Sequence, residues 1–117
     1  IVDRLKQLII RGGENISCLE VENEIYKFPG IQETAVFGVP DERMGEVVGA
    51  VVYAGDGASV DVEVLRAFLL EHMATFKVPE KIWVSPQRLP RGATDKLDKQ
   101  FIAKTALQFP PHLDATK

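Results

Sequence analysis

The chain has 117 residues, of which 45% are hydrophobic and 26% are charged, a balance typical of one globular domain that buries a sizeable core. The formal net charge of -3 argues against a general nucleic-acid binder, and no apolar run is long enough to cross a bilayer. The single cysteine, Cys18, excludes an internal disulfide and suits a reducing compartment such as the cytoplasm.

The chain opens with IVDRLKQLII, which has neither an initiating Met nor a signal-peptide pattern. Because this stretch leads directly into patterned sequence, we expect the chain to be a piece of a longer protein. The first predicted element is a β-hairpin. The apolar run 5–10 is followed by Arg11-Gly12-Gly13, and an extended stretch resumes at 14–16. Glycine and asparagine tolerate the positive φ that a hairpin turn needs.

A helix is predicted at about residues 18–28. Ser17 lies three residues before Glu20, which is the spacing of a capping box, and apolar residues then recur at helical spacing. Pro29-Gly30 ends the pattern.

Two strands, a second helix and a third strand are predicted next. Residues 34–39 and 47–53 are dense in Val, Ala and aromatic residues, as in strands that are buried on at least one face, and a polar connection joins them. Residues 61–74 carry apolar side chains at helical spacing, and residues 81–85 indicate a strand.

A last helix is predicted from about Lys99 to Gln108, and Pro110-Pro111 begins a polar tail at 110–117 that we expect to be flexible. Helices and strands alternate along the chain in short segments. The sequence therefore predicts an α+β domain with a small mixed β-sheet, about three helices and a leading β-hairpin.

Common catalytic and metal-binding patterns are absent from the sequence. His72 and His112 are far apart, and His72 lies off the apolar stripe of its helix, which favours a partly exposed structural role. Cys18 lies on the predicted inward face of the first helix, where a small core residue is more common than a nucleophile. Since no metal-ligand spacing, phosphate loop or dinucleotide fingerprint is present, we predict no metal site.

Two polar loops remain as candidate sites, at residues 11–15 and 88–99. A charged, glycine-containing loop is most often a solvated turn, and the pattern alone leaves that interpretation open. Each loop also suits an anionic ligand, because glycines let backbone N–H groups approach closely and a lysine offers a mobile positive charge.

Nine short segments carry further information when they are taken in order. They are VDRLK at 2–6, IIRGGENI at 9–16, EVE at 20–22, FPG at 28–30, AVFGVPD at 35–41, GEV at 45–47, FKVP at 76–79 and, in the last loop, LP at 89–90 with TDKL at 94–97. This order resembles the C-terminal domain of the adenylate-forming enzymes over nearly the whole chain, up to about Lys104. That superfamily includes acyl-CoA synthetases, firefly luciferase and the adenylation domains of nonribosomal peptide synthetases. The resemblance is greatest to fatty-acyl and aryl-CoA ligases.

The resemblance implies a two-step reaction in one active site between a large N-terminal domain and this small lid. A carboxylate attacks the α-phosphorus of ATP and forms an acyl-adenylate and pyrophosphate. The thiol of CoA then displaces AMP and forms a thioester, after the lid has rotated about a hinge. The full enzyme would use a small carboxylic acid, ATP, CoA and Mg²⁺. We expect the isolated chain to bind none of them and to be inactive.

The resemblance also implies roles for single residues. Lys96 matches the adenylation lysine, whose charge offsets the repulsion between the carboxylate and the phosphate. Asp95 departs from the family, which usually has glycine at that position, and this puts the loop geometry in question. Lys99 is a second cation in the loop, but we expect it to begin the last helix.

Further matches concern the hinge and the CoA-facing surface. Lys6 matches the hinge residue, and Arg4 matches an arginine near the nucleotide. Phe76 and Lys77 match positions at which some CoA ligases contact the CoA nucleotide. The hairpin that lines the pantetheine channel is matched by Gly12, Gly13, Glu14 and Asn15.

We therefore predict a hinge segment at 1–6, a lid domain at 7–109 and a tail at 110–117. The lid would have its own N-terminal domain as its partner, with no nucleic acid and no membrane span. Two alternatives stay open. The lid could serve an adenylate-forming enzyme with another acceptor, such as a carrier protein or oxygen. From a different class, the chain could be a free-standing α+β module that binds anions or a partner protein.

Overall fold

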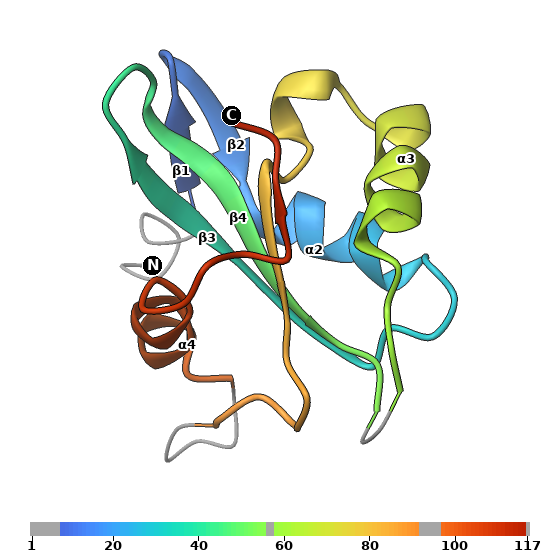
Figure 1. Ribbon diagram of the computed structural model, residues 1–117. Helices are drawn as coiled ribbons and strands as arrows, with labels where there is room; N and C mark the ends of the chain where they lie inside the picture. Colours follow the sequence, from blue (N-terminus) through green and yellow to red (C-terminus); the bar gives the residue numbers. More distant parts are fainter. Residues whose placement is uncertain (1–7, 56–57, 92–96, 117) are drawn as a thin grey trace.

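The structure of the chain is a computed structural model that describes residues 8–55, 58–91 and 97–116. A six-stranded sheet runs through the molecule, and helices cover both of its faces (Figure 1). The strands are β1 (Leu8–Arg11), β2 (Glu14–Ser17), β3 (Glu33–Asp41), β4 (Gly45–Tyr53), β5 (Lys81–Val84) and β6 (Leu113–Asp114). The helices are α2 (Cys18–Tyr26), α3 (Val62–His72), the 3-10 helix η1 (Thr75–Lys77) and α4 (Lys99–Ala106).

The long β3–β4 hairpin forms the centre of the sheet. Its antiparallel ladder begins with Glu33 opposite Tyr53 and ends with Asp41 opposite Gly45. Strand β5 pairs with β4 in parallel, and β6 pairs with β5 antiparallel. The β1–β2 hairpin joins the start of β4 through Arg11, which lies opposite Gly45. The sheet is therefore mixed, because one of its strand pairs is parallel.

Each of the three α-helices in the described ranges begins at a side chain that accepts hydrogen bonds from its first turn. Ser17 accepts one from the Glu20 amide before α2, and Asp98 accepts one from the Phe101 amide before α4. Asp61 accepts two before α3. These caps satisfy amides that have no partner inside the helix, which fixes where each helix starts.

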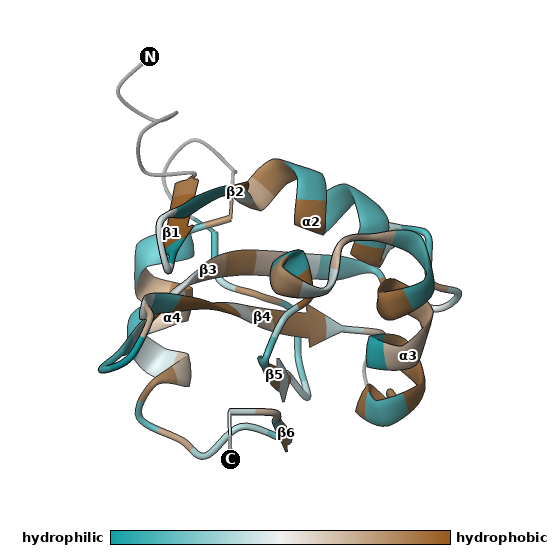
Figure 2. Ribbon diagram, turned by 90° about the horizontal axis from the view of Figure 1, so that it is seen from above, coloured by the Kyte–Doolittle hydropathy of each residue, from teal (hydrophilic) through white to brown (hydrophobic). Residues whose placement is uncertain are grey.

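Alternate residues of β3 and β4 fill two cores on opposite faces of the sheet. Val36, Val48 and Val52 point into the core under α2 and α3. Phe37 and Val51 point into the core under α4. Figure 2 shows the hydrophobic residues that follow one another along β4. Burial on both faces explains the nearly continuous apolar runs of these strands, since each fully buried side chain contributes about 1.5–3 kcal/mol.

The predicted α+β class, mixed sheet, leading hairpin and three α-helices are confirmed. The flexibility of the C-terminal tail stays a prediction, but its described part contains a strand that the sequence did not predict. In its described part, the His112 amide donates to the Ile82 carbonyl at 2.8 Å, and Leu113 lies opposite Ile82 in the β5–β6 ladder. The reason is that β5 offers a free edge of backbone groups, and pairing with β6 satisfies them while Leu113 is buried.

Candidate functional site

The residues singled out from the sequence fall into two groups in the structure. The β1–β2 turn and η1 are described in full. Arg4, Lys6, Asp95 and Lys96 lie outside the described residues, so their predicted roles stay predictions. The site is therefore built from the hairpin, from η1, and from the residues that precede and follow 92–96.

The β1–β2 turn presents its backbone to solvent. Gly12 and Gly13 have φ values of 56° and 90°, a region that favours glycine, and Arg11 lies opposite Glu14 across the turn. Gly12, Gly13, Glu14 and Asn15 are all exposed. The four residues thus form one accessible edge without a large side chain at its tip.

Two contacts fix this turn to the body of the sheet. The Gly12 amide donates to the Met44 carbonyl at 2.9 Å, and Arg11 Nε donates to Glu80 Oε1 at 2.6 Å. A Cβ on Gly12 would lie 2.6 Å from Met44 Cε, so the turn also fits closely against the β3–β4 connection. The glycine edge is therefore exposed on one side and held in place on the other.

The η1 segment lies beside the start of α2. Lys77 Nζ donates to both carboxylate oxygens of Glu20, at 3.2 and 2.9 Å. Phe76 packs its ring against the core under α2 and α3, and Lys77 Nζ lies 5.9 Å from the centre of that ring. Lys77 is thus a cation near the hairpin end of the molecule that already has a carboxylate partner.

A second candidate site consists of the residues directly before and directly after 92–96. Arg91 and Leu97 form an antiparallel bridge, and the Asp98 amide donates to the Pro90 carbonyl at 2.9 Å. Asp98 then caps α4. The chain therefore enters and leaves residues 92–96 at one place on the surface, directly before the last helix.

Glu33, the first residue of β3, binds the segment that leads into this site. Its Oε1 accepts the Leu89 amide at 2.9 Å, and its Oε2 accepts hydrogen bonds from Arg91 and, at 3.4 Å, from Arg88. Glu33 is 6% exposed and is the buried charged residue within the described ranges. Burial by itself raises the pKa of Glu33, but the Leu89 amide and the guanidinium groups of Arg91 and Arg88 outweigh it and lower that pKa below its ordinary value.

Lys99 has a structural partner at the start of α4. Its Nζ lies 2.7 Å from Glu22 Oε2 on α2, and the same oxygen accepts the Val36 amide at 2.9 Å. The prediction that Lys99 begins the last helix is confirmed. The ion pair joins α4 to α2 and β3, which distinguishes Lys99 from the Lys96 that precedes the helix.

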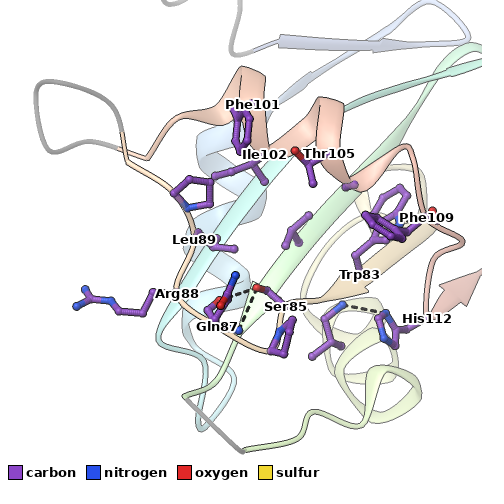
Figure 3. Close-up of a pocket in the computed structure, with 15 residues that line it drawn as sticks. Trp83, Ser85, Gln87, Arg88, Leu89, Phe101, Ile102, Thr105, Phe109 and His112 are labelled. Carbon is purple, nitrogen blue, oxygen red and sulfur yellow. Dashed lines mark hydrogen bonds between the residues drawn. The ribbon is translucent and has the colours of Figure 1, made fainter.

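An apolar groove of about 470 Å³ lies between α4 and the segment after β5. Figure 3 shows Phe101 and Ile102 on the α4 side of this groove and Leu89 on the facing side. Phe101 and Phe109 are 54% and 60% exposed, while Trp83 also lines the groove and donates through Nε1 to the Phe109 carbonyl at 2.9 Å. No pattern in the sequence predicted this groove, because its lining comes from three separate parts of the chain.

The histidines and the cysteine have structural contacts. His72 is exposed, stacks on Phe68 with ring centres 4.3 Å apart and bonds the Phe68 carbonyl, as expected for a structural residue. His112 Nδ1 accepts the Val84 amide at 3.0 Å. Cys18 is buried, and this burial raises the pKa of its thiol to about 11, which suits a core residue and not a nucleophile.

The hairpin site and the Glu33 site lie at opposite ends of β3. Gly12 contacts the Asp41–Gly45 connection at one end, and Glu33 stands at the other. Eight residue steps along an antiparallel strand separate these ends by about 27 Å. In Figure 1 the β1–β2 turn accordingly lies near the top of the molecule and the segment after β5 lies near the bottom. Within the described ranges, no group of three potential ligands could hold a metal, and no helix is long and apolar enough to cross a membrane.

Comparison with known proteins assigns this arrangement to a family. Residues 20–96 match the AMP-binding enzyme C-terminal domain. A feruloyl-CoA synthase from Amycolatopsis sp is 48% identical over 99 residues, which are 85% of this chain and 20% of that protein. The chain therefore belongs to the family of C-terminal domains of AMP-binding enzymes, and its relatives are CoA ligases.

Solved structures agree with this assignment. A fatty acyl CoA synthetase from Mycobacterium tuberculosis superposes with a TM-score of 0.79 and 35% identity, over 87% of this chain and 20% of that one. ATP-bound MatB from Rhodopseudomonas palustris superposes with a TM-score of 0.78 and 38% identity, over 86% of this chain and 20% of that one. The chain thus spans about a fifth of the length of the relatives it matches.

Proposed function

We propose that this chain is the mobile C-terminal lid of an ATP-dependent acyl-CoA synthetase. The observation that supports the proposal is that the β1–β2 turn and the residues flanking 92–96 lie at opposite ends of one sheet. A rigid body with two such ends can present one of them to a shared active site during adenylation and the other during thioester formation. The hinge for this rotation would be Lys6, which lies outside the described residues.

In the adenylation step, Lys96 would supply a positive charge where a carboxylate approaches the α-phosphate of ATP. Two anions repel each other, and a fixed cation between them lowers the energy of the transition state. Asp95, which takes the place of the family's glycine, adds a negative charge beside this lysine. Arg4 would lie near the nucleotide.

In the thioester step, the β1–β2 turn would line the channel for the pantetheine arm of CoA. The exposed edge formed by Gly12 and Gly13 fits a thin, flexible ligand, since no side chain at the tip obstructs it. Glu14 and Asn15 flank the edge with polar groups. Phe76 and Lys77 would contact the CoA nucleotide, which requires Lys77 to exchange its Glu20 partner for a phosphate. We assign no residue of this chain to Mg²⁺.

The test separates the two half-reactions in the full-length enzyme that contains this chain. Acyl-adenylate formation is measured as pyrophosphate release without CoA, and thioester formation is measured with supplied acyl-adenylate. Lys96→Ala should reduce the first rate about 100-fold or more, because it removes a charge used in that transition state, and should change the second about twofold at most. Equal losses in both rates would refute the role of Lys96.

A second experiment addresses the acceptor and the completeness of the site. The purified 117-residue chain should show no turnover with ATP, CoA and a carboxylic acid, since the acyl pocket would lie in the N-terminal domain. Supplying the full-length enzyme with CoA or with a holo-carrier protein tests the alternative acceptor. Turnover that depends on the carrier protein and not on CoA would replace the CoA proposal with that alternative.

A further inference from the structure

Glu33 makes a set of contacts that the core of the sheet does not require. A carboxylate buried to this extent loses most of its hydration, which is costly unless other groups replace it. Here one oxygen accepts the Leu89 amide and the other accepts the guanidinium groups of Arg88 and Arg91. All three donors come from the segment that leads into residues 92–96 and lie at least 55 positions from Glu33 in sequence.

The same segment also contacts the residues that directly follow 92–96. Arg91 bridges to Leu97, and the Pro90 carbonyl accepts the Asp98 amide. Asp98 in turn caps α4, which packs on the sheet through Ile102. Glu33 therefore fixes the position of the segment that ends at Arg91, and through Arg91 and Pro90 the position of Leu97 and Asp98.

We propose that Glu33 is a positioning residue for the adenylation step, which holds the base of the Lys96 segment so that the lysine is delivered to a fixed point. This inference rests on the proposed role of Lys96. Glu33 itself would touch no substrate. A lysine side chain is long and flexible, so the precision of its charge depends on where its backbone is anchored.

The lowered pKa of Glu33 agrees with this role, because it keeps the carboxylate ionised at neutral pH and able to accept from all three donors. Glutamine at this position can still accept the Leu89 amide through its carbonyl oxygen. It lacks the charge that pairs with Arg91 and Arg88. Glu33→Gln is therefore a conservative change of shape that releases the arginines.

The test uses the full-length enzyme and a carboxylic acid that the wild type accepts, chosen from a panel of aromatic and aliphatic acids that includes ferulate. Glu33→Gln should reduce acyl-adenylate formation about 10- to 100-fold, the size of effect that misplacing a catalytic group produces. Thioester formation from supplied acyl-adenylate should stay within about twofold. Equal losses in both rates would overturn the inference.

Thr34→Val is the matched control for a loss of stability. Thr34 is the next residue of β3, is buried, and donates through Oγ1 to the Val51 carbonyl at 2.9 Å, on the opposite face of the sheet. This change removes a buried hydrogen bond without touching the Lys96 segment. It should destabilise the fold and leave the ratio of the two half-reactions unchanged. A ratio shifted as far as in Glu33→Gln would show that general destabilisation explains both variants.

A double variant separates this inference from the proposed function. If Glu33 acts through Lys96, Glu33→Gln added to Lys96→Ala should reduce acyl-adenylate formation by less than about twofold beyond Lys96→Ala alone. A further tenfold loss would overturn the positioning role while Lys96 keeps its own. If Lys96→Ala alone is not step-specific, the proposed function fails first and the inference fails with it.

Arg91→Lys keeps the test decisive if Glu33→Gln does not fold. Lysine retains the charge but lacks the planar fork of arginine, so the contact with Glu33 is weakened and not removed. This variant should show a smaller loss, about threefold to tenfold, in the same step. A loss confined to thioester formation would contradict the inference.

Discussion

The two ends of the β3–β4 hairpin are held by different kinds of contact. At the β1–β2 end, a glycine turn with positive φ lies against Met44, and the partly exposed Arg11–Glu80 pair secures it. At the other end, the buried carboxylate of Glu33 collects two arginines and a backbone amide. One end thus depends on backbone shape and the other on buried charge.

This difference in contacts agrees with the role proposed for each end of the hairpin. A channel wall for a thin ligand needs bare backbone at a fixed position, and glycine provides it. A lysine that binds two anions needs a backbone anchor that stays in place during the reaction. A buried ionic network with complete hydrogen bonding provides a rigid anchor. The two ends should therefore respond differently to substitution.

The largest change in stability is expected at the Glu33 end. Glu33→Gln in the 117-residue chain should lower the free energy of unfolding at pH 7 by about 2–3 kcal/mol, because charged hydrogen bonds in a buried site are lost. Chemical denaturation followed by circular dichroism measures this loss. A value below about 0.5 kcal/mol would show that the network does not stabilise the fold.

The same variant gives a pH signature. Because folding lowers the pKa of Glu33 below its ordinary value of 4.5, its stabilisation is fully present above that pH and is lost as the pH falls through the folded-state pKa. The difference in unfolding free energy between wild type and Glu33→Gln should therefore be greatest at neutral pH and shrink below about pH 4.5. A difference that grows in acid would contradict the assigned direction.

An intermediate effect is expected at the hairpin end. Gly12→Ala places a Cβ at φ 56° and should cost about 1–2 kcal/mol of unfolding free energy. In the full-length enzyme it should slow thioester formation and leave acyl-adenylate formation unchanged. Gly13→Ala is the matched control, since its φ is 90° but nothing lies within 4 Å of the added Cβ. Because a non-glycine residue is at least as strained at φ 90° as at φ 56°, any loss in Gly12→Ala beyond that of Gly13→Ala is a lower limit for the cost of the contact with Met44.

The smallest effect on stability is expected in η1. The Lys77–Glu20 pair is partly exposed, so Lys77→Ala should cost less than about 1 kcal/mol. In the full-length enzyme this variant should raise the KM for CoA a few-fold without changing acyl-adenylate formation, if Lys77 contacts the CoA nucleotide. Glu20→Gln removes the same ion pair and keeps the lysine. An equal rise in KM for both variants would assign the effect to the ion pair and not to the lysine.

Local signals in the sequence predicted the elements of this fold well. The capping box at Ser17 and Glu20 marked the start of α2, and the Gly12-Gly13 turn marked the β1–β2 hairpin. The apolar runs at 34–39 and 47–53 were strands, although β3 and β4 extend to Asp41 and from Gly45. These signals succeed because caps, turns and alternation depend on neighbours a few residues away. The ordered segments, together with the family motifs, also indicated the class of protein.

Only the tertiary structure showed what Glu33 and the C-terminal tail do. Nothing near Glu33 in the sequence marks it, because its partners lie 55 to 58 positions away and meet it through the packing of the segment after β5. The polar tail gave no strand signal, yet β6 forms because the edge of β5 offers it partners. The sequence by itself determined the elements, the family and the candidate lysine, through short-range chemistry and motif order. The tertiary structure decided which distant residues pair with the Glu33 carboxylate and which segments lie at opposite ends of the sheet. Both depend on how the chain folds back on itself.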